Sequence, residues 1–265
     1  NELVADGRVD ALVVCSPNVN HHGDAVTAID AGVHVLLEKP VTVTLAECDD
    51  LAERARRAGV TVGSGHMWRH RAEVIAMRDS IARGDLGRIV RTHGYGIHAH
   101  WGPGGWFVDP VRAGGGALID MGIHAIDTVR FLLGDPVPVR VRASLGRGEY
   151  SDIAVEDDGV VLIEWDNGVR SVVEFGWRQP VLEGLEADTK VYGTGGTARI
   201  WPGHDSYGAG YQHCSPPMYA SQVRDFVAAC REGREPVSSL AVGRVADRKS
   251  TRLNSSHVSE SRMPS

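Results

Sequence analysis

The sequence has few cysteines and no excess of positive charge, and both absences limit its possible functions. Its four cysteines are too scattered for a metal knuckle and too few for a disulfide scaffold, so a reducing cytoplasm is expected. The formal net charge is -6, whereas general nucleic-acid binders usually carry an excess of Lys and Arg. We therefore expect a small-molecule partner and no nucleic acid.

Long apolar runs are missing as well. No run approaches the roughly 20 residues that a membrane helix needs, so no membrane partner is expected. The chain begins Asn1-Glu2-Leu3, with neither an initiator Met nor a signal-peptide pattern, so a signal on a preceding segment would not be visible. With 265 residues, 42% of them hydrophobic, the chain can form one large domain or two smaller ones.

The first part of the sequence alternates short apolar runs with helical segments. A capping-box spacing, Thr44 followed by Glu47, marks one helix start, and Gly32 and Gly59 mark helix ends. Strands that alternate with helices predict a parallel α/β sheet, which this chain enters midway because no earlier strand and helix precede the first run. The predicted elements are strands at 11–15, 33–37 and 60–62 and helices at 21–31 and 44–59.

From Ile89 the pattern changes to short strands separated by Gly-rich turns. The turn Asp166-Asn167-Gly168 joins two apolar runs and predicts a hairpin, because Asn-Gly favours tight primed turns. These features predict an α+β domain with a mostly antiparallel sheet. Its expected elements are hairpins at 158–165 with 169–175 and at 190–192 with 197–201, and helices at 117–133 and 218–231. Residues 247–265 resemble a translated sequencing adapter and are interpreted as a non-native tail.

Two predicted strands end in polar segments that could form a site. Ser16-Pro17-Asn18 follows the first strand, with His21 at the start of the next helix, and Glu38-Lys39-Pro40 ends the second. Ligands of open α/β sheets bind outside the carboxyl ends of the strands, so both segments are expected to face one crevice. The Lys39 ammonium could bind a substrate hydroxyl or a cofactor ribose there. Taken alone, Lys39 is more commonly explained as a surface lysine at a strand end. An ordinary Pro-Asn turn explains Ser16-Pro17-Asn18 as well as a binding site does.

The helix predicted after Gly114-Gly115-Gly116 carries a polar stripe. Asp120, His124 and Asp127 are spaced by four and three residues, which places them on one helical face. A His can accept the hydroxyl proton when a carbinol loses hydride, and a carboxylate one turn away can orient the ring. A simple surface pair of Asp and His remains the alternative.

Two tryptophans, Trp101 and Trp106, flank a Gly-Pro-rich loop before this helix. Aromatic faces suit the C–H surfaces of sugars, although packing is the more common role of Trp. His98 and His100 share a strand face but have no third ligand nearby, so no metal is expected.

With these motifs in order, the chain resembles the Gfo/Idh/MocA oxidoreductase family, which includes glucose-fructose oxidoreductase and inositol dehydrogenase. The similarity spans nearly all of residues 1–246. It rests on Val13-Val14-Cys15-Ser16-Pro17-Asn18 with His21, on Gly32-Val33-His34-Val35-Leu36-Leu37-Glu38-Lys39-Pro40, and on Gly114-Gly115-Gly116-Ala117-Leu118-Ile119-Asp120 with His124.

The resemblance implies a partial Rossmann domain at 1–65 that binds NAD or NADP. It is followed at 66–246 by an α+β domain whose mostly antiparallel, open sheet covers the nicotinamide and forms homo-oligomers. By position, the catalytic residues are Lys39, Asp120 and His124. The implied cofactor-binding residues are Ser16, Pro17, Asn18, His21, Glu38, Lys39, Pro40 and Arg69, and the candidate substrate contacts are Trp101, Trp106 and Asp127.

The family's G-x-G-x-x-G turn, which receives the pyrophosphate, would precede Asn1, so the chain is predicted to be an open-ended fragment that is inactive alone. The residue that distinguishes NAD from NADP is missing with it. The expected reaction is hydride transfer between nicotinamide and a hydroxyl carbon of a sugar, cyclitol or related polyol, with His124 as base, Asp120 orienting it or binding a hydroxyl, and Lys39 polarising the reacting oxygen. The alternatives are an NAD-dependent glycosidase and a non-catalytic regulator with the same fold.

Overall fold

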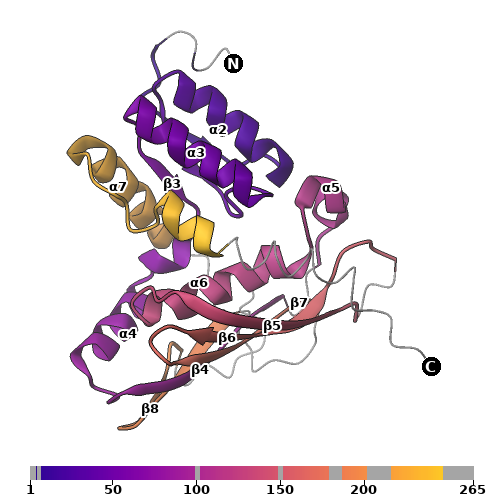
Figure 1. Ribbon diagram of the computed structural model, residues 1–265, viewed down its shortest axis with the longest axis vertical. Helices are drawn as coiled ribbons and strands as arrows, with labels where there is room; N and C mark the ends of the chain where they lie inside the picture. The colour runs from indigo at the N-terminus through magenta and orange to yellow at the C-terminus, as the bar shows by residue number, and fades with distance from the viewer. Residues whose placement is uncertain are drawn as a thin grey trace.

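The computed structural model describes residues 4, 7–98, 102–148, 152–178, 187–201 and 216–246. They form a smaller part, built around a parallel sheet, and a larger part built around an extended sheet, with helices between them (Figure 1). Trp101, His100 and the predicted tail at 247–265 lie outside the described residues.

The smaller part confirms the predicted parallel sheet. Its strands lie in the order β1-β2-β3 and both pairs are parallel. The capping box also forms, because the Thr44 hydroxyl accepts the Glu47 N–H at 3.2 Å and the Glu47 carboxylate accepts the Thr44 N–H at 2.9 Å. The elements are β1 (Ala11–Val14), η1 (Asn18–Asn20), α2 (His21–Asp30), β2 (His34–Leu37), α3 (Leu45–Ala58) and β3 (Val62–Ser64).

The larger part contains a six-stranded sheet of order β5-β6-β7-β4-β8-β9. Every neighbouring pair is antiparallel except β4 and β7, which are parallel and were not predicted as such. Both predicted hairpins are present, and Gly168 has the positive φ, 82°, that the tight turn requires. The strands are β4 (Ile89–His98), β5 (Pro138–Gly146), β6 (Asp158–Trp165), β7 (Arg170–Trp177), β8 (Ala187–Gly193) and β9 (Thr197–Arg199).

One helix packs along the inner face of this sheet and carries the predicted polar stripe. The expected helix at 117–133 is a π turn, η4 (Leu118–Gly122), followed by a regular α-helix, α6 (Ile123–Leu132). A Cβ at Gly96 of β4 would lie 2.5 Å from the Met121 carbonyl oxygen, so glycine allows strand and helix to approach closely. The shared core joins the helix to the sheet through Leu118, Ile126, Val129, Val161, Val173, Phe175 and Trp177.

Some of the remaining segments join the two parts, whereas α4 (Ala72–Arg83) packs against α6 of the larger part. The last described segment returns to the smaller part, where the Ser64 N–H donates to the Ser238 carbonyl at 2.7 Å and Leu240 joins the core around β1 and β2. The predicted second domain therefore contributes residues to both cores. These elements are η2 (Met67–His70), α4 (Ala72–Arg83), η3 (Gly105–Val108), α5 (Pro110–Ala113) and α7 (Pro216–Glu232).

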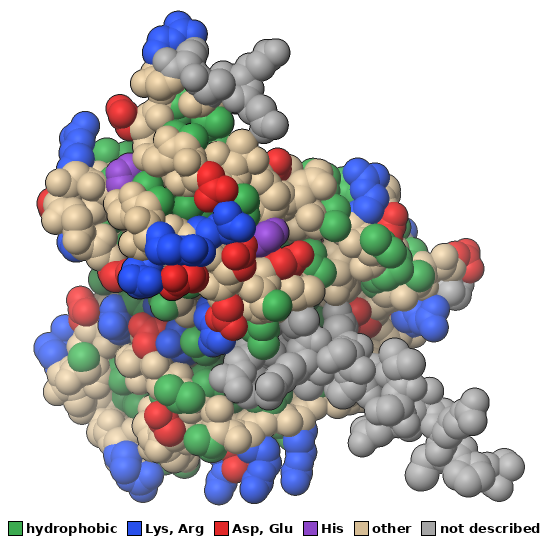
Figure 2. All heavy atoms as spheres, turned by 45° about the horizontal axis from the view of Figure 1, so that its top comes forward, with side chains coloured by type: hydrophobic (Ala, Val, Ile, Leu, Met, Phe, Trp, Pro, Cys, Tyr) green, Lys and Arg blue, Asp and Glu red, His purple; other side chains and the backbone are tan. Residues whose placement is uncertain are grey.

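Charged side chains of both signs are interspersed over the middle of the face shown in Figure 2. On α2 and α3, for example, Arg54 lies 2.9 Å from Asp30 and 2.8 Å from Asp50. Within the described residues, no helix combines the length and the apolar character needed to cross a bilayer.

Candidate active site

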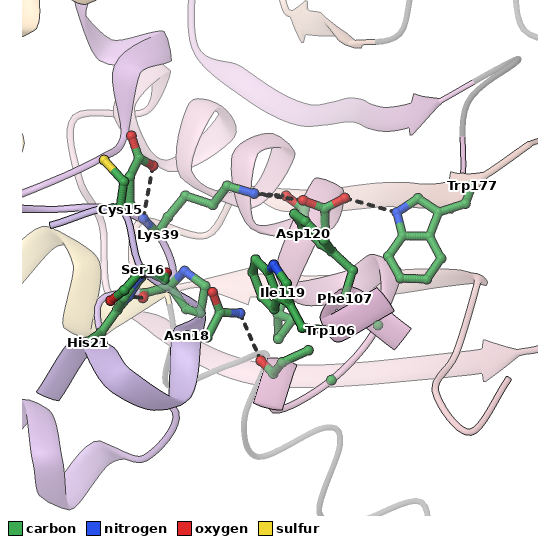
Figure 3. A pocket seen from close by; sticks show the side chains of 15 residues that line it. Cys15, Ser16, Asn18, His21, Lys39, Trp106, Phe107, Ile119, Asp120 and Trp177 are labelled. Carbon is green, nitrogen blue, oxygen red and sulfur yellow. Dashed lines mark hydrogen bonds and ion pairs between the residues drawn. The ribbon is translucent and has the colours of Figure 1, made fainter. Parts of the chain in front are cut away.

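A pocket lies where the carboxyl ends of β1 and β2 meet the start of the η4–α6 helix (Figure 3). Its empty volume is about 610 Å³, part of it open to solvent. Most of the predicted site residues come together here, as expected for parallel strands that end at one sheet edge. The predicted residues that line it are Ser16, Asn18, His21, Glu38, Lys39, Pro40, Trp106 and Asp120.

Lys39 and Asp120 form an ion pair within this pocket. Lys39 Nζ lies 2.9 Å from Asp120 Oδ1 and 2.7 Å from the Asp120 carbonyl oxygen, and the side chains are 16% and 12% exposed. Asp120 Oδ2 accepts a hydrogen bond from Trp177 Nε1 at 2.9 Å. Burial raises the pKa of the Asp120 carboxyl, but the Lys39 charge and the two donors outweigh it and hold that pKa below its usual value. Asp120 is therefore an anion at neutral pH.

The ammonium of Lys39 keeps donor capacity for a ligand. An ammonium carries three N–H groups, and the two hydrogen bonds to Asp120 use two of them. Within the described residues, the third is left without a protein acceptor, and Lys39 lines the pocket. The arrangement can hold an oxygen atom of a small molecule against a fixed positive charge.

His124 lies in a different environment from Asp120, although both belong to the predicted polar stripe. The π turn shifts Asp120 relative to the regular helix that carries His124, and Asp120 pairs with Lys39 instead. His124 is 6% exposed and lines a small apolar pocket with Trp68 and Trp201. Its Nδ1 is buried and has no hydrogen-bond partner within the described residues. The expectation that Asp120 orients the His124 ring thus has no hydrogen bond to support it.

The protonation state of His124 follows from its surroundings. Burial lowers the pKa of the ring well below its usual value, and the charges of Lys39, His66 and His98 act in the same direction. The imidazole is neutral at pH 7, so one ring nitrogen can accept a proton.

His21 links the two loops that follow β1 and β2. Its Nδ1 lies 2.8 Å from the Pro40 carbonyl oxygen and its Nε2 lies 2.8 Å from the Ser16 carbonyl oxygen. Carbonyl oxygens only accept, so both bonds form together only when both ring nitrogens carry hydrogen. Asn18 Nδ2 donates to the Ala113 carbonyl at 2.8 Å and connects the first loop to α5. Both side chains therefore shape the pocket in addition to lining it.

Arg69 and Asp127, like His124, are not among the residues that line this pocket, and they bind each other. Arg69 is 1% exposed, with Nη2 2.7 Å from Asp127 Oδ1 and 2.6 Å from Asp135 Oδ1. The predicted contacts of Arg69 with a cofactor and of Asp127 with a substrate gain no support from this geometry. Pro17 is not among the lining residues either.

The pocket and its immediate surroundings also contain residues that the sequence did not single out. Phe107 stacks on Trp106 with ring centroids 4.0 Å apart, and the two line one wall. Trp177 ends β7 and lies beside Asp120 (Figure 3). Glu156 Oε1 accepts the Gly116 and Leu118 N–H groups at 3.0 and 3.2 Å, so it caps the Gly-rich helix start. Strand alternation could have placed Trp177 on the inner face with Phe175, but not beside Asp120.

A parallel sheet whose strand ends meet an open, mostly antiparallel sheet beside the Lys39–Asp120 pocket is the two-part arrangement that the resemblance of the motifs implied. Residues 1–66 match the family described as oxidoreductase family, NAD-binding Rossmann fold, and residues 74–199 match the GFO/IDH/MocA C-terminal domain. The chain belongs to the Gfo/Idh/MocA family, which confirms the resemblance found in the motifs.

Individual relatives agree with this assignment. A 1,5-anhydro-D-fructose reductase of Ensifer adhaerens is 38% identical over 171 residues, 63% of this chain and 50% of the reductase. The rhizopine catabolism protein MocA of Rhizobium meliloti is 30% identical over 240 residues, 88% of this chain and 71% of MocA. The structure of GenD2 from gentamicin A biosynthesis, in complex with NAD, is 27% identical with a TM-score of 0.85, covering 100% of this chain and 81% of GenD2. The chain thus spans about half the length of the reductase.

Proposed function

We propose that this protein transfers a hydride between NAD or NADP and a hydroxyl-bearing carbon of a sugar, cyclitol or related polyol. The observation that carries the proposal is the Lys39–Asp120 pair in a pocket at the carboxyl ends of two parallel strands. The relatives support the substrate class, since they include the reductase above, a D-glucoside 3-dehydrogenase and a myo-inositol 2-dehydrogenase.

The residues present fit the nicotinamide and ribose end of such a cofactor. Ser16 and Glu38 lie at the strand ends, and the third N–H of Lys39 is available to a ribose or substrate hydroxyl. The printed sequence contains no G-x-G-x-x-G turn for the pyrophosphate, so these residues hold only part of the cofactor. When bound, the nicotinamide supplies the hydride acceptor or donor.

The side chains of this chain would divide the remaining work. Lys39 donates a hydrogen bond to the reacting oxygen, and Asp120 keeps the ammonium in place. His124, neutral at pH 7, is the proposed proton acceptor, although its ring lines the apolar pocket with Trp68 and Trp201 and not the pocket of Lys39. Trp106 and Phe107 present aromatic faces to the C–H surface of the ring.

The test is an activity assay on a completed enzyme, in which this chain follows the first strand, glycine-rich turn and helix of a family member that binds NAD. We expect NADH formation that depends on added myo-inositol or a related polyol. Lys39→Ala should lower kcat by about two orders of magnitude, the usual effect of removing a donor to the reacting oxygen. Lys190→Ala, on the sheet strand β8, is the matched control and should leave the rate unchanged.

Two outcomes would contradict the proposal. Release of sugar from a glycoside without net NADH would identify an NAD-dependent glycosidase. Binding of NAD and polyol by the completed enzyme, without turnover of any polyol, would identify a regulator.

We also propose that copies of the chain associate through the outer face of the six-stranded sheet. Leu162 is 50% exposed on this face, opposite Arg142 of β5 and near two ion pairs, Arg140 with Glu164 and His93 with Glu174. Leu162→Arg should shift sedimentation toward the monomer, and an unchanged sedimentation profile would reject this surface. We also propose a cytoplasmic location, which the small number and scattered positions of the cysteines support.

A further inference from the structure

Trp177 occupies a position next to the site that the proposed reaction does not explain. Its indole Nε1 donates to Asp120 Oδ2 at 2.9 Å, from the side opposite Lys39 (Figure 3). Trp177 is 1% exposed and the Asp120 side chain 12%, so water has little access to this hydrogen bond. Trp177 also lines the pocket.

Each oxygen of the Asp120 carboxylate accepts a hydrogen bond from a different donor. Oδ1 accepts from Lys39 and Oδ2 accepts from Trp177, so neither oxygen is left without a donor in a side chain only 12% exposed. Without the indole N–H, Oδ2 would be a nearly buried acceptor that lacks this partner, and the carboxylate could rotate away from Lys39. Because the indole is uncharged, its hydrogen bond holds the carboxylate in place without adding a second positive charge that would compete with the ammonium of Lys39.

Trp177 is itself held rigidly. Its backbone N–H donates to the Asp157 carbonyl at 2.9 Å, and it pairs with His98 in the parallel register of β4 and β7. Its ring packs in the core that joins Phe175 to η4 and α6. The sheet therefore fixes the indole, and the indole fixes the carboxylate.

We propose that Trp177 is a positioning residue, which through Asp120 holds the Lys39 ammonium where it meets the reacting oxygen of the substrate. This role rests on the proposed function. The end of β7 would thus contribute to the reaction through Asp120, without contact between Trp177 and the reacting atoms.

The variant that isolates this role is Trp177→Phe, which keeps an aromatic wall and removes the N–H donor. In the completed enzyme we expect kcat to fall roughly tenfold, the usual scale for one hydrogen bond to a charged group, with the KM for polyol nearly unchanged. Site-specific replacement by benzothienylalanine, which keeps the indole shape but has sulfur in place of N–H, should reproduce the effect. This second replacement remains informative if the phenylalanine variant does not fold.

Trp165→Phe is the matched control. Trp165 lies in the same core, is 3% exposed, and donates its Nε1–H to Ser171 Oγ at 2.7 Å, away from Asp120. Trp165→Phe loses the same kind of hydrogen bond and a similar side-chain volume. Any change in its kcat therefore measures the structural effect of the substitution alone. We expect its kcat to stay near that of the unmodified enzyme.

A titration separates this inference from the proposed function. In the printed chain, the ¹³C signal of the Asp120 carboxyl, identified by its loss in Asp120→Asn, should titrate at higher pH in Trp177→Phe than in Trp165→Phe, because a donor to the ionised form is lost. This measurement needs no turnover, so it remains valid if the completed enzyme oxidises no polyol. An unchanged titration would overturn the contact, and a shifted titration with kcat equal to that of Trp165→Phe would overturn the positioning role.

Discussion

Arg69 and Asp127 form a buried ion pair, with Arg69 Nη2 2.7 Å from Asp127 Oδ1 and side chains 1% and 2% exposed. Arg69 lies in η2, directly after the parallel sheet, and Asp127 lies on α6, the helix that carries His124. The pair therefore links the segment that leaves the smaller part to the helix that contributes to the site.

Removing one partner of this pair should destabilise the fold. Asp127→Ala leaves the Arg69 charge buried with only Asp135 beside it, and we expect a loss of about 3–5 kcal/mol in the free energy of unfolding, measured with urea. Glu53→Ala removes an exposed partner of Arg56 and should change stability little. Equal losses in the two variants would mean that the buried pair contributes no more than a surface one.

A second prediction concerns stability in acid. His66 is 1% exposed, and burial lowers its pKa from 6.5 to about 4; Asp127 opposes this shift, and Arg69, Lys39 and Arg130 add to it. Below pH 6.5 the unfolded chain binds a proton at this position that the folded chain takes up only near pH 4. The free energy of unfolding should therefore fall with pH across this window, by roughly 3 kcal/mol in all.

Urea unfolding at pH 7 and pH 5 measures this dependence. His66→Gln should reduce it, whereas His93→Gln, on the outer sheet face, should preserve it. A dependence that is the same in both variants would assign the acid destabilisation to other groups, with His124 the next to test because its pKa is also lowered.

The parts of the fold with local signals could be predicted from the sequence. Thr44, Glu47 and Gly59 delimit α3 because capping and helix termination depend on neighbouring residues alone. The approach of Ser16 to Lys39 followed from one general property, that parallel strands end at the same sheet edge.

Features that depend on distant residues could not be predicted in this way. Pairing of β4 with β7, the bond from Trp177 to Asp120, and the pairing of Arg69 with Asp127 each join positions far apart in the chain. The helical spacing of the polar stripe also concealed the π turn that separates the surroundings of Asp120 and His124. Sequence periodicity predicts which residues share a face of a regular helix, but it does not predict which residue each side chain contacts.

The Gly-rich helix start provides a third prediction. A Cβ at Gly116 would lie 1.9 Å from the Glu156 carbonyl oxygen, so Gly116→Ala forces apart the helix start and the segment that caps it. We expect clear destabilisation and loss of activity in the completed enzyme. Gly23→Ala in α2, where a Cβ meets nothing within 4 Å, should instead stabilise the fold by about 0.5–1 kcal/mol. If thermal melting shows the two alanines to be equivalent, Glu156 does not approach the helix start as closely as this.

The last prediction concerns the proton acceptor. If His124 accepts the hydroxyl proton, His124→Ala in the completed enzyme should lower kcat by about two to four orders of magnitude, with NAD affinity little changed. The active form of a base is the unprotonated one, so the rate should rise with pH through an inflection. Because burial and Lys39 lower the pKa of His124, this inflection should fall below pH 6.5 and the rate should be flat around neutrality.

His124→Ala should remove this inflection, and His93→Ala, a histidine of the outer sheet face, should retain it. This comparison is needed because Asp120 also titrates in acid and could cause an inflection of its own. The inflection and the proton transfer are assigned to the His124 ring only if His124→Ala loses both the inflection and the rate. If His124→Ala keeps near-normal turnover and the same pH profile, the proton goes to another group. Lys39 is then the first candidate because it lines the pocket where the reacting oxygen would lie, although its ammonium would have to lose a proton before it could accept one.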